Sequence, residues 1–335
     1  MFRKSFLTIL LLVVIVSFSF GDESKQKFQV VYLDGELNVQ KNGAWKSLSV
    51  GDELSSDSTI KLKSNTIVEL SGNGSRIIVS KKGIYSIDKL IKKEKVFLLW
   101  KLTKIVRQNF RSLTGKAKRK SPGIMGVRGA EVGGSGSGES IGWADESSDL
   151  LEEGTELFKK GKYEKALEPL LEGLDSVGED TEEKIKQELL FYTGYSYFLL
   201  GEKAQALKYL RRIRLDSDSE HLEELLLARG KLFLDSFDFE EALGSFQMYI
   251  TNFPEGGGLQ TAYYLAALSA ESLATEYKET ATKESATKET ETSKSGDTSA
   301  RIEYRKLRNR YLEKAYLTDP SSDIGRTARE MLQGK

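Results

Sequence analysis

The sequence predicts a chain of two parts, a small antiparallel β module followed by an all-α helical-repeat solenoid. Three observations support this fold class. Between residues 27 and 87, apolar residues alternate with polar ones in short runs, a pattern that is typical of half-buried strands. A glycine- and serine-rich stretch follows at 133–138. In the C-terminal half, a spacing of glycine, bulky residue and alanine then occurs three times.

Residues 1–21 have the composition of a secretory signal peptide. Arg3 and Lys4 precede an apolar run from Phe6 to Phe20, and the polar residues after Gly21 suit cleavage at that point. The alternative is an uncleaved membrane anchor, although about 15 apolar residues fall short of the roughly 20 that span a bilayer. We therefore expect an exported, periplasmic protein, associated with the envelope if the segment is retained. The chain has no cysteine, which excludes disulfides and thiolate metal sites.

The strands of the β module are predicted from residues that alternate along one face. Asn73-Gly74 between the last two strands predicts a type I′ hairpin turn, because both residues tolerate positive φ. The inward-facing residues are expected to be Phe28, Val30, Tyr32, Leu37, Val39, Ile60, Leu62, Val68, Leu70, Ile77 and Val79.

Short sequence motifs in this part resemble the FecR-type periplasmic domain, which would cover residues 27–132. They are Trp45, Leu48, Gly51-Asp52 and Leu54, then Ser58-Thr59-Ile60, Val68-Glu69-Leu70, Gly74-Ser75-Arg76-Ile77 and the stretch Ser121 to Glu131. The most specific piece is Pro122 followed by Val127, Arg128 and Gly129. The resemblance implies a module that binds a partner or an envelope component.

This sequence departs from the FecR pattern in three places. Only Met1 to Lys4 precede the apolar run, where the family has a cytoplasmic anti-sigma region. Ala130 stands where the family usually has threonine, and a glycine-rich run replaces the strands that normally follow. Transcriptional signalling is therefore not expected. The second interpretation of the chain is an envelope sensor of FecR type without an anti-sigma region.

A basic segment at 91–120 follows the predicted strands. Residues 81–130 hold fifteen lysines or arginines against two acids, whereas the whole chain is formally neutral. Apolar residues at helical spacing accompany the cations Lys101, Lys104, Arg107 and Arg111. One interpretation is a basic amphipathic helix on an anionic envelope surface. The other is a core strand or helix at 96–100 with a solvated lysine fringe. Export argues against a nucleic-acid partner.

After a Gly/Ser linker at 133–149, the repeated spacing predicts paired helices. Its copies are Gly154/Leu157/Ala166, Gly194/Tyr197/Ala206 and Gly230/Phe233/Ala242, which lead on to Leu170, Leu210 and Phe246. A small residue lets a second helix approach closely. Gly161 and Gly201 fall at the turns. The third copy has Phe237 there, so we expect a turn of different construction.

This pattern resembles the tetratricopeptide repeat over residues 150–332. A fourth helix pair is predicted at Tyr263–Leu273 and Arg301–Tyr316, and an insert at about 276–300 is expected to be disordered because it lacks large apolar side chains. A capping helix is predicted from Ile324, Ala328, Met331 and Leu332. Pro169 lies inside a predicted helix, where we expect a bend.

A partner-binding groove is predicted on the stripe beside the packed one. In the second unit this stripe carries Phe191, Tyr195 and Phe198, and the matching residues in the other units include Phe158, Leu227 and Lys231. Aromatic anchors with a nearby cation suit a protein or peptide partner. The alternative is that Phe191 and Phe198 pack against adjacent repeats.

The sequence gives little support for catalysis. His221 is the only histidine, and we expect it to be a solvated surface residue near a helix start. The glycine run lacks the lysine and the preceding strand of a phosphate-binding loop. We expect no enzyme activity, no cofactor and no metal. The predicted function is an exported adaptor that binds proteins through the repeats and an envelope component through the β module.

Overall fold

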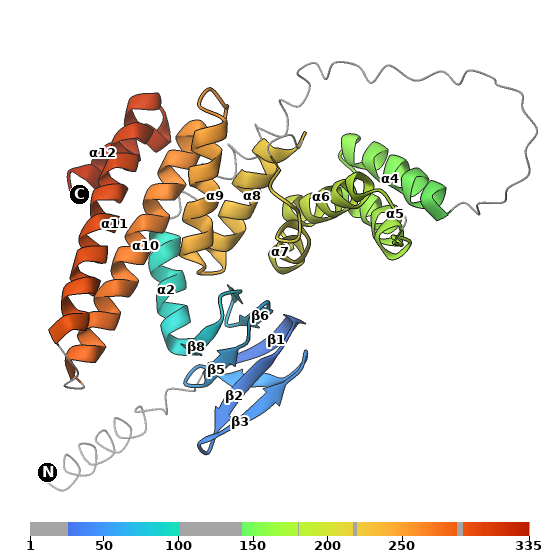
Figure 1. The fold of residues 1–335 in the computed structure, drawn as a ribbon. Coiled ribbons are helices and arrows are strands. Elements are labelled where there is room, and N and C mark those ends of the chain that lie inside the picture. The colour runs from blue at the N-terminus through green and yellow to red at the C-terminus, as the bar shows by residue number, and fades with distance from the viewer. Residues whose placement is uncertain (1–25, 101–142, 180, 217–219, 287–290, 335) are drawn as a thin grey trace, which may run out of the picture.

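The computed structural model describes residues 26–100, 143–179, 181–216, 220–286 and 291–334. Within these residues, two small antiparallel sheets precede a series of stacked helices (Figure 1). This arrangement confirms the predicted fold class, β followed by α.

Each sheet has four strands. The first has the order β4-β1-β6-β7 and the second has the order β3-β2-β5-β8. The bounds are β1 Lys27–Asp34, β2 Leu37–Lys41, β3 Ala44–Leu48, β4 Glu53–Ser55, β5 Thr59–Leu62, β6 Ile67–Gly72, β7 Ser75–Val79 and β8 Gly83–Ser86.

The predicted inward-facing residues form the core of this β module. Ten of the eleven are buried, and Tyr32 is partly buried at the edge of the core. The β6–β7 hairpin turns at Asn73 and Gly74, whose φ angles of 49° and 74° fit the predicted type I′ turn. Alternation of apolar residues therefore located the sandwich core correctly.

Among the described residues, the helices after the β module form four antiparallel pairs and a final capping helix. Helix α2 precedes them and extends from the β module. The bounds are α2 Ile87–Trp100, α4 Trp143–Lys159, α5 Tyr163–Asp175, α6 Glu183–Leu200, α7 Lys203–Leu210, α8 Leu222–Asp235, α9 Phe239–Asn252, α10 Leu259–Ala286, α11 Glu291–Thr318 and α12 Asp323–Leu332. In α12, Ile324, Ala328 and Met331 are buried, as expected of a cap.

The three glycines of the repeated spacing lie where paired helices meet. A Cβ added at Gly154, Gly194 or Gly230 would lie 2.5, 2.7 or 2.6 Å from the side chain sixteen residues later. These distances are too short for a real contact, so only glycine permits this approach. The spacing in the sequence is thus a helix-packing contact.

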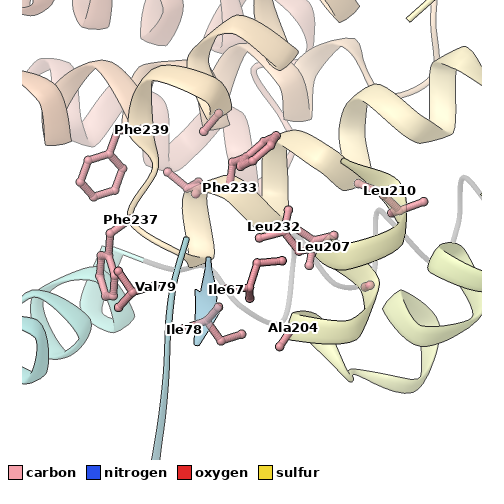
Figure 2. Close-up of a cluster of buried hydrophobic side chains, with 14 of the residues drawn as sticks. Ile67, Ile78, Val79, Ala204, Leu207, Leu210, Leu232, Phe233, Phe237 and Phe239 are labelled. Atoms are coloured by element: carbon pink, nitrogen blue, oxygen red, sulfur yellow. The ribbon is translucent and has the colours of Figure 1, made fainter. Parts of the chain in front are cut away.

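The turns of the first three pairs share one backbone conformation. Gly161, Gly201 and Phe237 have φ angles of 75°, 89° and 61°. The expectation of a differently built third turn was wrong, because Phe237 adopts the left-handed region although it has a side chain. Its ring is buried beside Val79 of the β module, and this packing offsets the backbone strain (Figure 2).

One expectation about helix continuity is corrected and one stays a prediction. Pro169 lies inside α5 and is buried, and the helix continues through it, so the bend expected there remains a prediction. The expected disordered insert is helical in its described residues, since α10 runs to Ala286 and α11 begins at Glu291. Alanine, lysine and glutamate favour helix strongly, and this preference outweighs the absence of large apolar residues.

The β module packs directly on the helices. Strand β6 is buried on both faces, with Val68 and Leu70 inside the sandwich. On the other face, Ile67 lies with Ile78 in a cluster that includes Ala204, Leu207 and Leu232 from α7 and α8 (Figure 2). The two parts of the chain therefore share one hydrophobic core.

Polar contacts surround this apolar interface. The Arg211 guanidinium lies 3.2 Å from Asp34 and donates to the Asn65 carbonyl at 2.9 Å. The Ser80 and Ser236 hydroxyls are 2.7 Å apart. Two further contacts are the ion pairs Lys81–Glu240 at 2.8 Å and Lys93–Glu276 at 2.9 Å, the second joining α2 to α10. In Figure 1, α2 lies beside α10.

Candidate protein-binding surface

Seven rings gather where α4, α5, α6 and the start of α8 meet, and we call them the aromatic cluster. Phe158 on α4 lies 5.2 Å from both Tyr163 and Tyr192, measured between ring centroids. Phe191 stacks on Tyr195 at 5.2 Å. The members are Phe158, Tyr163, Phe191, Tyr192, Tyr195, Phe198 and His221. Such aromatic groups are frequent anchors in protein interfaces.

His221 is a member of this cluster, which corrects the expectation of a solvated surface residue. Its imidazole stacks on Phe191 with centroids 4.2 Å apart and planes 4° apart. Burial lowers the pKa of His221, and the nearby Glu220 opposes this shift. The imidazole is therefore neutral at neutral pH.

Three carboxylates border the cluster. Burial, followed by the negative charges of Glu188, Glu220 and Glu224, raises the pKa of Tyr192 to about 12. Burial also raises the pKa values of Glu188 and Glu224 themselves. The surface therefore combines aromatic rings with negative charge, and we call Glu188, Glu220 and Glu224 the acidic rim.

The structure brings four of the predicted groove residues together, with unequal exposure. Phe158 and Phe198 are half-buried, whereas Phe191 and Tyr195 retain 5% and 3% of their surface. Phe191 and Tyr195 are therefore more deeply buried than Phe158 and Phe198, and they pack beneath the exposed part of the cluster. A partner could contact only their edges in this conformation.

The third-unit residues lie elsewhere. Leu227 is buried and packs near Gly258. Lys231 pairs with Asp235 at 2.6 Å, and Lys203 approaches the same carboxylate at 2.7 Å. In the β module, Arg76 lies 3.4 Å from the buried Glu69 and 3.6 Å from Glu202, which precedes α7. The Arg76–Glu202 pair joins the β module to the helices, whereas the pairs of Asp235 lie within and between α7 and α8.

The remaining predicted site residues lie outside the described residues. They are the basic-segment cations Lys101, Lys104, Arg107 and Arg111 and the FecR-like motif residues Pro122, Val127, Arg128 and Gly129.

Sequence reasoning missed Tyr192, His221 and the acidic rim. Tyr192 directly follows Phe191, so helical geometry places it about 100° away from that stripe. Its place in the cluster depends on the approach of α4 and α8. No single-helix pattern contains that information.

The described residues hold no group of three or more histidine, cysteine, aspartate or glutamate side chains arranged to bind a metal ion. None of the helices described is both long and apolar enough to cross a membrane.

Comparisons with known proteins give one family match within the helical half. Residues 188–217, which cover most of α6 and all of α7, match the family model described as tetratricopeptide repeat. No curated protein matches the chain. Among solved structures, "MamA RS-1 ArsTM double mutant" matches with a TM-score of 0.32 and 18% identity, covering 56% of this chain and 90% of that chain. The chain thus contains a tetratricopeptide repeat, a type of scaffold that is generally non-catalytic and binds protein partners.

Proposed function

We propose that this protein is a non-enzymatic adaptor that binds a protein partner over the aromatic cluster. The observation that carries the proposal is the position of the cluster, because four of its seven rings lie on α6, within the stretch that matches the tetratricopeptide repeat. Half-buried Phe158, Tyr163 and Phe198 offer apolar area at low cost in conformational entropy. The acidic rim adds polar groups at the edge of this area.

Photo-crosslinking in the native cells tests the proposal. A photoreactive amino acid replaces Phe198 in the full chain, and in a control variant it replaces Leu317, an exposed residue on α11. We expect a protein adduct from position 198 and none from position 317. Equal adducts from both positions, or none from 198, would contradict a binding site at the cluster.

We further propose that the protein is exported to the periplasm and that the β module binds an envelope component. The signal-like residues 1–21, the FecR-like motifs and the basic segment support this part. Mass spectrometry of the protein recovered from its cells tests it. A mature chain that begins after Gly21 agrees with export, and an intact Met1 end would contradict cleavage.

The docked β module favours a second candidate function, an envelope sensor in which the repeats respond to the module. Such coupling needs a shared interface, which Arg211, Asp34 and the Ser80–Ser236 contact provide. Arg211→Gln removes a charged contact from this interface. A sensor predicts that partner crosslinking at position 198 changes in this variant, whereas a passive tether predicts no change.

A further inference from the structure

We propose that the aromatic cluster and its acidic rim receive a lysine or arginine side chain from a segment of the partner protein. This inference rests on the proposed adaptor function and specifies the chemistry of the partner.

The carboxylates of the rim have little positive charge beside them. Lys184 approaches Glu188 at 4.0 Å, and its own side chain is 80% exposed, so solvent screens this pair. No ion pair among the described residues includes Glu224, which is partly buried. Burial raises the pKa values of both carboxyls, and a cation from outside would stabilise their charged forms.

The hydroxyls of Tyr192 and Tyr195 also favour a cationic side chain as the ligand. Tyr195 is 3% exposed, the negative charge of Glu224 acts on its hydroxyl, and no described residue forms a hydrogen bond with it. Tyr192 lies within the field of all three rim carboxylates. A guanidinium or ammonium group brings several N–H donors, which could bond these oxygens together.

The rings supply the second half of the recognition. A cation above an aromatic face is attracted by the ring quadrupole, and its aliphatic stem can pack on neighbouring rings. Phe158 is half-buried and lies edge-on to Tyr192, which stands among the carboxylates. A long cationic side chain could therefore contact aromatic carbon and carboxylate oxygen at once.

The basic groups nearest the surface do not fill this role in the structure. Lys159 on α4 acts on Glu188 and His221 only through its electrostatic field, and its residue is exposed. His221 lies within the cluster, but its lowered pKa keeps the ring neutral. An acidic segment would meet uncompensated carboxylates and be repelled, so a basic segment is favoured.

Peptide binding to the full chain tests the inference. The probes are short labelled helical peptides with identical length and apolar residues, which carry arginine, glutamine or glutamate at the same positions. Fluorescence anisotropy measures their affinity at low and at physiological salt. The test variant is Glu188→Gln with Glu224→Gln, which keeps the fold because it removes two charges that burial disfavours. The matched control is Glu313→Gln with Glu330→Gln, two exposed residues on α11 and α12.

We expect the arginine peptide to bind best. Its affinity should fall roughly tenfold in the test variant and stay unchanged in the control, because a partly buried charge partner is lost only in the first. Phe158→Leu keeps apolar volume but removes a ring, and it should weaken the arginine peptide more than the glutamine peptide.

Two results would overturn the inference. One is equal or tighter binding of the glutamine or glutamate peptide. The other is an equal loss of affinity in both double variants, which would indicate attraction to net charge alone. In either case a crosslinked partner at position 198 would leave the adaptor function standing, so the two proposals fail separately.

Discussion

Because Phe237 has a left-handed backbone conformation, we expect its glycine variant to be more stable than its alanine variant. Replacing a buried phenylalanine by alanine costs about 3–5 kcal/mol of unfolding free energy. The ring of Phe237 is 5% exposed, so Phe237→Ala should lie within this range. Phe237→Gly loses the same ring but also relieves the strain of a φ of 61°. That strain is worth about 1 kcal/mol after allowing for the greater freedom of glycine in the unfolded chain.

We therefore expect Phe237→Gly to be more stable than Phe237→Ala by about 1 kcal/mol, the reverse of the order in a helix interior. Urea denaturation followed by circular dichroism measures both. Gly161→Ala and Gly201→Ala calibrate the backbone effect, since their φ angles are 75° and 89° and no atom lies within 4 Å of an added Cβ. Each should cost about the same 1 kcal/mol. A Phe237→Gly variant less stable than Phe237→Ala would refute this account of the turn.

Three further predictions concern helix packing and buried charge. Gly194→Ala should destabilise the fold by about 1–3 kcal/mol in urea denaturation because its Cβ would lie 2.7 Å from Leu210, whereas Gly244→Ala, with open space around it, should be neutral or stabilising. Asp235→Asn should cost about 3–5 kcal/mol in the same assay, since two lysines lose their buried partner; a loss below 1 kcal/mol would contradict this. Burial raises the pKa of Asp238 from 3.8 to about 6, so the folded state binds more protons than the unfolded state between these values. The melting temperature should gain from this group as pH falls from about 6 toward 3.8, and Asp238→Asn should remove that gain; an unchanged pH profile would refute it.

Most of the fold could be predicted from the sequence because its determinants are local or periodic. Alternation located the strands, and the glycine at a fixed distance from a bulky residue located the helix pairs. Phe237 shows where this reasoning ends. Its ring packs beside Val79, a residue far away in the sequence, and no local pattern contains that contact.

The candidate site was predicted only in outline. Helical geometry identified the stripe of Phe191, Tyr195 and Phe198, but burial depends on the neighbouring helices. Packing of α4 and α8 covers the first two and brings His221 onto Phe191. A single helix pattern gives the direction of a side chain and leaves open whether another element covers it.

Arrays of stacked helix pairs can change their length and curvature, because each pair contacts only its neighbours. Here the β module and α2 act as a brace, since their polar contacts reach α7, the α8–α9 turn and α10. The brace should stiffen the second to fourth pairs, leaving α4 and α5 as the part freest to hinge. The aromatic cluster straddles that boundary, so a ligand seated there would hold the hinge at one angle.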